Sequence, residues 1–290
     1  MSKRVWTAPN EEAIEAWNTV LFDKFCRFRE TVIRGLSFHG DAALERHPPA
    51  QGSRVLDIGC GFGDASVTLA QRVGPSGQVL GIDAAARFVE AAAQAARTAG
   101  LSQLGFLRAD VQGDALGSGF NYAFSRFGTM FFQSPVQALR NVRRSLVAGG
   151  KLCMVVWRRR EDNAAVHVAE RVVRQVAPDL PQDDDVTCGP GPFSMASADV
   201  VSDILLASGF DSVVLQRCDA PLRIGADLDE AIAFAMELGP AGELLRRGGK
   251  EAERHRPEIE AALRKAFKDF AEADGILLPS STWIVSARAA

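Results

Sequence analysis

The chain has 290 residues, a formal net charge of -3, and a composition that is 47% hydrophobic and 24% charged, values typical of globular domains. They exclude a disordered chain, a fibrous repeat and a disulfide scaffold. Because the charge is near neutral and the chain has no basic tail, we do not expect a nucleic-acid partner. At this length we expect one elaborated domain over residues 1–290 rather than two equal halves.

The amino-terminal residues Met1 to Trp6 are followed by polar residues rather than by an apolar stretch, so we do not expect a secretory signal. No run of eighteen apolar residues occurs in the sequence, and we expect no membrane partner. The five cysteines are odd in number and lack a C-x-x-C spacing, which argues against a disulfide framework and a zinc site. The sequence therefore predicts a cytoplasmic protein that holds no metal.

Hydrophobic spacing predicts a helical N-terminal segment over residues 10–47 and an alternation of strands and helices after it. Strands are predicted at 54–58, 78–83, 104–108, 122–125, 152–157, 212–217 and 282–286. Helices are predicted at 64–72, 84–99, 135–146, 164–176, 198–208, 229–247 and 258–273. Helices that alternate with nearly continuous apolar strands indicate the α/β class, with a mostly parallel sheet covered on both faces.

The first predicted strand runs into a glycine-rich loop, Asp57-Ile58-Gly59-Cys60-Gly61-Phe62-Gly63, that leads into a helix. Glycines at this place let the backbone approach a ligand more closely than a β-carbon would allow, beside a helix amino terminus. The dinucleotide pattern G-x-G-x-x-G fails, because Asp64 stands three positions after Gly61. We therefore do not expect a nicotinamide dinucleotide here.

Acidic residues end the next two predicted strands. Asp83 follows Gly63 by twenty residues, at a position where a carboxylate can accept both hydroxyls of a ribose. Asp110 ends the third strand and is a candidate acceptor for adenine. Because the carboxyl ends of parallel strands share one edge, where open α/β sheets bind their ligands, the loop and both carboxylates are expected to meet one ligand.

The stretch Val55 to Gly63 resembles the first motif of class I S-adenosylmethionine-dependent methyltransferases. Further segments resemble the small-molecule branch near the ubiquinone and menaquinone biosynthesis methyltransferases, namely Trp17-Asn18, Ser125 to Phe132, Pro135 to Leu139, Gly149-Gly150 and Pro190 to Phe193. The resemblance implies a Rossmann-like, mostly parallel seven-stranded sheet whose last strand is antiparallel. We divide the predicted domain into an N-terminal helical cap (8–48), a cofactor-binding half (51–160), a substrate-side half (161–224), a helical lid insertion (225–275) and a final strand (276–290).

The resemblance also implies S-adenosylmethionine as the cofactor. The loop from Gly59 to Gly63 would hold its methionine part, Asp83 its ribose, and Asp110 with the Val111 amide its adenine. Ser125, Arg126 and Phe127 would lie beneath the transferring methyl group. The complete set of cofactor-binding residues expected in this way is Asp57, Gly59, Cys60, Gly61, Gly63, Asp83, Ala84, Asp110, Val111, Ser125, Arg126 and Phe127.

The acceptor is expected to be a small apolar or aromatic molecule that is methylated on oxygen, nitrogen or carbon. Candidate walls of its pocket are Phe127, Met130, Phe131, Phe132, Trp157, Phe193, Phe234 and Met236. The sequence departs from the family at Asn163-Ala164-Ala165, where Asn-Pro-Trp is usual, and this removes a large side chain near the expected pocket. A sulfonium methyl transfers mainly through alignment with its acceptor.

Where the acceptor must lose a proton, His167 and His39 are the candidate catalytic bases, with the alternative that each is an ordinary helical histidine. Two further alternatives stay open at this point: a non-catalytic protein that binds S-adenosylmethionine for regulation or structure, and an insertion at 225–275 that serves as the arm of a homodimer instead of a lid. We interpret Asp183-Asp184-Asp185 as a solvated loop and not as a divalent-metal site.

Overall fold

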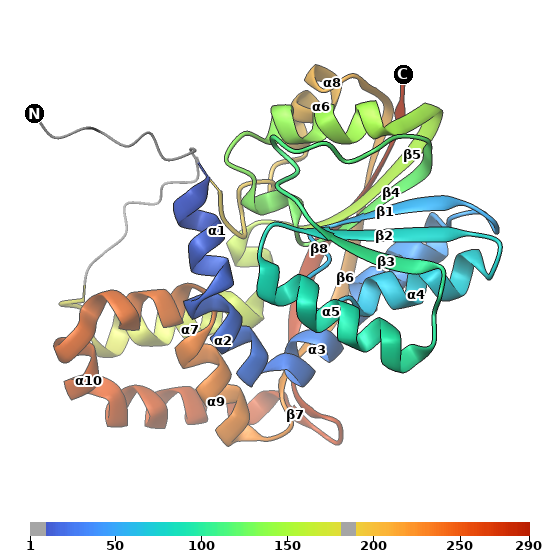
Figure 1. The fold of residues 1–290 in the computed structure, drawn as a ribbon. Coiled ribbons are helices and arrows are strands. Elements are labelled where there is room, and N and C mark those ends of the chain that lie inside the picture. The colour runs from blue at the N-terminus through green and yellow to red at the C-terminus, as the bar shows by residue number, and fades with distance from the viewer. Residues whose placement is uncertain (1–9, 181–189) are drawn as a thin grey trace, which may run out of the picture.

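A single mixed sheet runs through the molecule, with helices on both faces, as a computed structural model shows for residues 10–180 and 190–290 (Figure 1). Its strands are β1 (Arg54–Ile58), β2 (Gln78–Asp83), β3 (Leu104–Arg108), β4 (Phe120–Arg126), β5 (Leu146–Trp157), β6 (Phe210–Gly225), β7 (Ala271–Glu272) and β8 (Gly275–Ala289). The order is β3-β2-β1-β4-β5-β8-β6, and the short β7 pairs only with β8. Strands β1 to β5 pair in parallel, whereas β8 is antiparallel to both of its main neighbours. The predicted seven-stranded sheet with an antiparallel last strand is confirmed, and β7 is the addition.

Helices α4 and α5 lie on one face of the sheet, and α6 and α8 lie on the other (Figure 1). This two-sided cover explains why the central strands read as almost continuous apolar runs. The helices are α1 (Glu11–Asn18), α2 (Val20–Arg27), α3 (Arg29–Arg46), α4 (Asp64–Val73), α5 (Ala86–Ala99), α6 (Pro135–Ser145), α7 (Ala164–Val176), α8 (Ala198–Ala207), α9 (Leu228–Glu237) and α10 (Gly239–Phe267). No helix in the described ranges is long and apolar enough to span a bilayer.

The N-terminal segment predicted as helical over 10–47 is helical, but it is broken into α1, α2 and α3 at Thr19 and Phe28. The breaks let its aromatic residues reach different partners. Phe22 of α2 packs edge-on against Phe88 of α5, with ring centroids 4.9 Å apart. Phe28, at the second break, packs against Phe234 of α9 at 5.5 Å. The broken helix therefore contacts both the sheet domain and the insertion.

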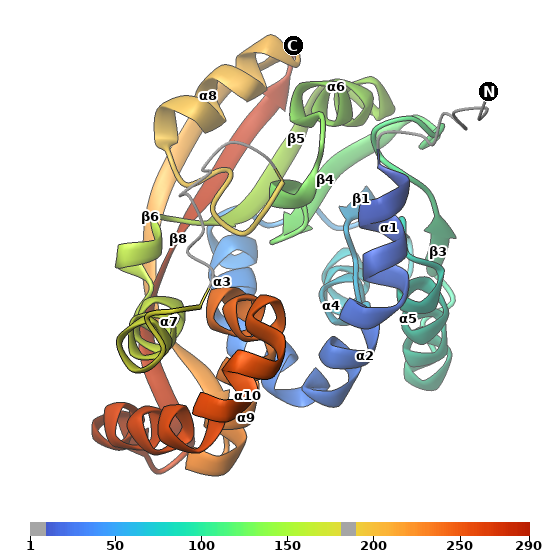
Figure 2. The same cartoon turned by 90° about the vertical axis from the view of Figure 1, so that its left-hand side faces the viewer.

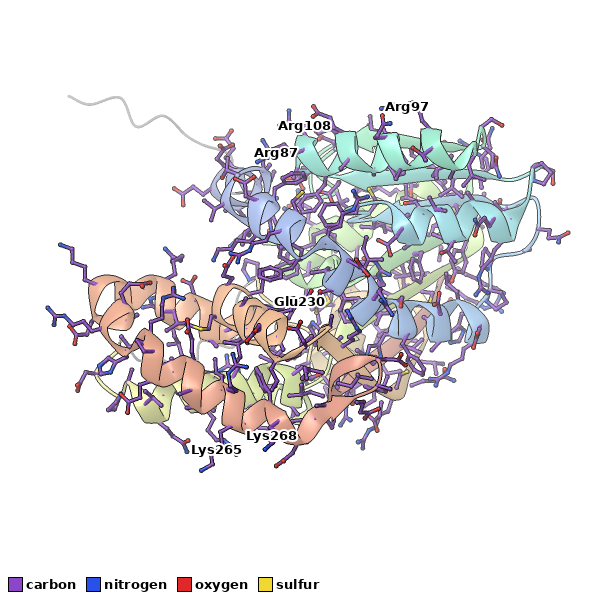
Figure 3. All side chains as sticks on the ribbon, turned by 90° about the horizontal axis from the view of Figure 1, so that it is seen from below. Arg87, Arg97, Arg108, Glu230, Lys265 and Lys268 are labelled. Atoms are coloured by element: carbon purple, nitrogen blue, oxygen red, sulfur yellow. The ribbon has the colours of Figure 1, made fainter. Side chains whose placement is uncertain are left out.

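A second hydrophobic core, the helical lobe, is built from α7, α9, α10 and the far ends of β6 and β8. Both strands are longer than predicted because they pair with each other beyond the parallel sheet, from Phe210↔Ala289 to Gly225↔Ile276. Figures 1 and 2 show the lobe beside the N-terminal helices, past the end of the sheet. In Figure 3, Glu230 lies at the junction between the lobe and α3, where it accepts a hydrogen bond from Thr31, while Lys265 lies on the outer side.

The two helices predicted at 229–247 and 258–273 are displaced in the structure. Helix α9 ends at Glu237, and α10 then continues to Phe267 with a kink at Gly249, whose φ of 50° is left-handed. Pro257 inside α10 follows this kink. Because glycines at this kink interrupt the hydrophobic spacing, the sequence did not predict that α10 continues through it.

Helix α3 packs closely on β6 at Gly35, where a β-carbon would lie 2.7 Å from the carbonyl oxygen of Arg223. Helix propensity alone predicts that Gly35→Ala stabilises the protein by about 1 kcal/mol. Because the obstacle is strand backbone, we expect instead a loss of about 1–3 kcal/mol in the free energy of unfolding, measured by urea denaturation. Ser37→Ala in the same helix is the control and should stay within about 0.5 kcal/mol of wild type. A stabilised Gly35→Ala would contradict the close packing.

Candidate active site

The glycine loop between β1 and α4 turns on left-handed glycines, with φ of 66° at Gly59, 53° at Gly61 and 80° at Gly63. The backbone N–H groups of Gly59 and Cys60 both donate to the carbonyl oxygen of Ile82, at 2.8 and 3.0 Å, which ties the loop to β2. A β-carbon at Gly63 would lie 2.8 Å from that of Ala92, whereas one at Gly61 would have no protein atom within 4 Å. Gly63 thus serves helix packing, and Gly61 leaves open space beside the loop.

Asp83 closes onto this loop from the end of β2. Its Oδ2 accepts the Gly61 N–H at 3.0 Å, and its Oδ1 accepts the Ala85 N–H at 3.0 Å. Burial raises the pKa of Asp83, and the backbone N–H donors oppose that shift. A carboxylate has more lone pairs than these two donors occupy, so Asp83 can still accept hydroxyl groups from a ligand.

Asp110 lies just after β3 and is held from two sides. Its Oδ1 accepts the backbone N–H of Gln112 at 3.0 Å, and its Oδ2 accepts Nδ2 of Asn10 at 3.1 Å. Asn10 immediately precedes α1, so the N-terminal helices close over this part of the sheet edge. Sequence reasoning missed Asn10, because no local pattern connects it with a residue one hundred positions away.

One cavity of about 740 Å³ joins the loop to the helical lobe. Its volume falls within the range of small-molecule sites. Nine of the predicted cofactor-binding residues line it: Gly59, Cys60, Gly61, Asp83, Ala84, Asp110, Val111, Arg126 and Phe127. The expected apolar walls also line it, namely Phe127, Met130, Phe131, Phe132, Trp157, Phe193 and Phe234. Met236 is not among the lining residues and is buried in the core of the helical lobe.

The other three predicted cofactor residues, Asp57, Gly63 and Ser125, do not line the cavity. The Oγ of Ser125 donates to the carbonyl of Ile58 at 2.8 Å, which fixes the strand that precedes the loop. Asp57 is buried in β1 and accepts a hydrogen bond of 2.5 Å from Oγ of Ser66 in α4. Ser125 and Asp57 therefore brace the strand and the helix that flank the loop.

Beside the loop, Phe127 and Arg126 form the wall that follows β4. Phe127 has a φ of 61°, a strained value for a residue other than glycine, and its ring stacks on Trp157 with centroids 4.2 Å apart. Arg126 makes an ion pair of 2.6 Å with Asp64, and both side chains line the cavity. The strained backbone therefore presents an aromatic ring and a charged pair to the same space.

The structure does not bring the two predicted catalytic histidines to the cavity. His39 is fully buried, and its ring nitrogens meet Oγ of Ser280 at 2.8 Å and Oγ1 of Thr282 at 3.0 Å. Burial lowers the pKa of His39 to about 4, so its ring is neutral at pH 7. His167 is half-buried on α7 and is likewise absent from the lining. We assign neither histidine a catalytic role.

An aromatic cluster over the loop was not expected from the sequence. Phe62, inside the loop, packs against Phe88 at 5.0 Å and Phe22 at 6.1 Å, and Trp17 packs on Phe88 and on Phe131. These contacts fasten α1 and α2 to the loop. The apolar spacing of the N-terminal segment predicted a helix, but it did not show which residues the buried face of that helix would contact.

The acidic run Asp183-Asp184-Asp185 lies outside the described residues. Within residues 10–180 and 190–290, no group of three or more His, Cys, Asp or Glu side chains is arranged to hold a metal ion.

The contact between Asp57 and Ser66 predicts a pH-dependent effect of Ser66→Ala. Burial raises the pKa of Asp57 to about 7, while the hydrogen bond from Ser66 opposes that shift. Between about pH 4 and pH 7 the unfolded chain has lost a proton that the folded Asp57 keeps, so this residue makes stability fall as pH rises. Without Ser66 the charged carboxylate loses its donor, so the pKa of folded Asp57 rises further and the fall in stability continues to higher pH. We expect Ser66→Ala to cost about 2 kcal/mol at pH 8 and about 1 kcal/mol at pH 5.

Urea denaturation at the two pH values measures this difference. Thr68→Ala in the same helix is the control, because its hydroxyl bonds the carbonyl of Asp64 and no carboxylate. Equal losses for Ser66→Ala at both pH values would show that Asp57 does not titrate in this range.

Comparison with known proteins gives consistent results. Residues 49–180 match a family described as a methyltransferase domain. Demethylmenaquinone methyltransferase of Staphylococcus carnosus is 32% identical over 105 residues, which are 34% of this chain and 41% of that protein. Aklanonic acid methyltransferase DauC of Streptomyces sp. strain C5 is 32% identical over 114 residues, which are 39% of this chain and 52% of that protein. The match thus spans about half or less of each curated relative.

Similarity to a solved structure extends over more of the chain. A putative methyltransferase from Bacillus halodurans superposes with a TM-score of 0.52 at 13% identity, covering 86% of this chain and 98% of that one. At this identity the likeness shows the fold alone. Residues 49–180, somewhat less than half of the chain, therefore resemble a methyltransferase domain, and the chain shares its α/β fold with that putative methyltransferase.

Proposed function

We propose that the protein transfers the methyl group of S-adenosylmethionine to a small apolar or aromatic acceptor, on oxygen, nitrogen or carbon, by in-line displacement. The observation that carries this proposal is the continuity of one cavity from the glycine loop to the apolar walls of the helical lobe. The names of the two curated relatives, which are methyltransferases of demethylmenaquinone and of aklanonic acid, support a small-molecule acceptor.

The residues at the loop end of the cavity fit the cofactor. Gly61 leaves its neighbouring space free of protein atoms, so backbone can approach the amino-acid part of a ligand closely. Asp83 has free acceptor capacity for ribose hydroxyls, and Asp110 has it for the amino group of adenine. When bound, S-adenosylmethionine would supply the methyl group, and its sulfonium sulfur would act as the leaving group.

The contribution of the protein is then chiefly alignment and the exclusion of water. Phe127 and Trp157 form a stacked wall between the loop and the lobe, and α1 and α2 cover the loop. Because neither His39 nor His167 lines the cavity, we propose that no histidine acts as a base on the acceptor. Proximity in a largely apolar pocket would supply most of the rate enhancement.

Asp83→Ala tests the cofactor assignment. Hydrogen bonds to a charged group contribute about 1.5–3 kcal/mol each, so we expect the affinity for S-adenosylhomocysteine, measured by calorimetry, to fall by a factor of about ten to a hundred. Asp83→Asn keeps one oxygen acceptor and should fall less. Asp211→Ala, on the edge strand β6, should bind like wild type. Unchanged affinity in Asp83→Ala would refute the assignment.

Turnover separates catalysis from simple binding. We expect purified protein with S-adenosylmethionine to form S-adenosylhomocysteine only when a small-molecule extract is added, as followed by mass spectrometry. Tight cofactor binding without product for any added extract would favour the non-catalytic alternative.

A further inference from the structure

Glu170 on α7 is buried, with a side chain that is 6% exposed, and it is only half satisfied. Two arginines bond to the same oxygen, Oε1: Arg160 at 3.0 Å and Arg174 at 2.9 Å. The second oxygen, Oε2, has no hydrogen-bond partner, and within the part of the chain that the structure describes it is the one buried side-chain oxygen or nitrogen in this state. A buried carboxylate oxygen without a donor is costly, so its survival in a folded protein needs a reason.

Glu170 lies on the face of α7 that lines the cavity, where a bound molecule could supply the missing donor. The helix turns one face to the cavity, and the residues that line it recur with helical spacing: Ala165, Val166, Ala169, Glu170 and Arg174. Ala165 and Ala169 are small, and the cavity continues along the helix as far as Glu170 and Arg174. Glu170 therefore stands at the lobe end of the space that begins at the glycine loop.

Beyond the two arginines, both apolar side chains and charged ones such as Arg223 and Glu243 line the lobe part of the cavity. Leu222, Phe234 and Leu244 line the same space from β6, α9 and α10, and Arg160 lies over the ring of Phe193 at 5.7 Å. An apolar molecule fills such a space well, but it would leave Oε2 without a donor. The terminal torsion of a glutamate side chain is broad, so a modest rotation can present this oxygen to a bound molecule.

We propose that Glu170 is a specificity-determining residue that recognises the acceptor, and that the acceptor is an apolar molecule carrying a hydroxyl or N–H donor that bonds Oε2. The inference rests on the proposed function, because it assigns the lobe end of the cavity to the acceptor. An acceptor held at Glu170 by its donor and along α7 by its apolar body lies between the helical lobe and the stacked pair of Phe127 and Trp157.

A matched pair of probes tests the need for a donor: 4-butylphenol and its methyl ether 4-butylanisole. Each is titrated by calorimetry into full-length protein saturated with S-adenosylhomocysteine. We expect wild-type protein to bind the phenol about tenfold more tightly than the ether, since a hydrogen bond to a charged group distinguishes them. Glu170→Leu should bring this ratio to about one, whereas Glu170→Gln, which keeps a carbonyl acceptor, should retain part of it.

Two further variants control for folding and for position. Ala169→Leu narrows the cavity next to Glu170 and should weaken both probes at least tenfold. Gln175→Ala changes the exposed side of α7 and should leave both affinities unchanged. All variants should bind S-adenosylhomocysteine as wild type does, because Glu170 and Ala169 lie on α7 and not on the strand ends and loop assigned to the cofactor.

The outcomes separate this inference from the proposed function. If wild-type protein binds neither probe, shows no preference for the phenol, or keeps its preference in Glu170→Leu, then the role of Glu170 is refuted while cofactor binding stands. Wild-type binding of the probes by Ala169→Leu would equally refute it. If wild-type protein fails to bind S-adenosylhomocysteine, the proposed function and this inference both fail.

Discussion

The organisation of the site depends on one contact, the hydrogen bond from the Gly61 N–H to the carboxylate of Asp83. It joins the loop after β1 to the end of β2, and the left-handed glycines are what allow the loop to reach that far. A carboxylate held in this way is buried against backbone donors yet keeps lone pairs for a ligand. The same contact therefore sets the shape of the loop and the chemistry of the cavity floor.

The cavity lies where separate packing units meet. The sheet contributes its carboxyl edge, the N-terminal helices contribute an aromatic cover through Trp17 and Phe22, and the helical lobe contributes apolar walls. Each unit buries its own hydrophobic face, so the space between them is not closed by core packing. Carboxylates that line this space can therefore bind a ligand: Asp83 and Asp110 at one end and Glu170 at the other.

The sequence predicted the sheet half well, because its strands are short, apolar and bounded by glycines, and because the loop from Gly59 to Gly63 has a distinctive spacing. It did not predict the break at Phe28 or the length of β6, since both are set by contacts with distant segments. His39 was chosen as a candidate base from its residue type, yet its burial between Ser280 and Thr282 is invisible in a linear pattern. Glu170 gave no signal at all, because only the folded chain shows that one of its oxygens lacks a donor.

The antiparallel pair of β6 and β8 has a consequence for how such proteins diversify. The two strands extend from the central sheet into the helical lobe, with register shifts only near their ends, and they connect the sheet to the segment between Gly225 and Gly275. During evolution, exchange of this segment would change the walls of the cavity in the helical lobe, while the carboxyl edge of the sheet proposed to bind the cofactor stayed the same. Replacement of this single contiguous segment could therefore change which acceptor the protein binds without disturbing the cofactor-binding edge.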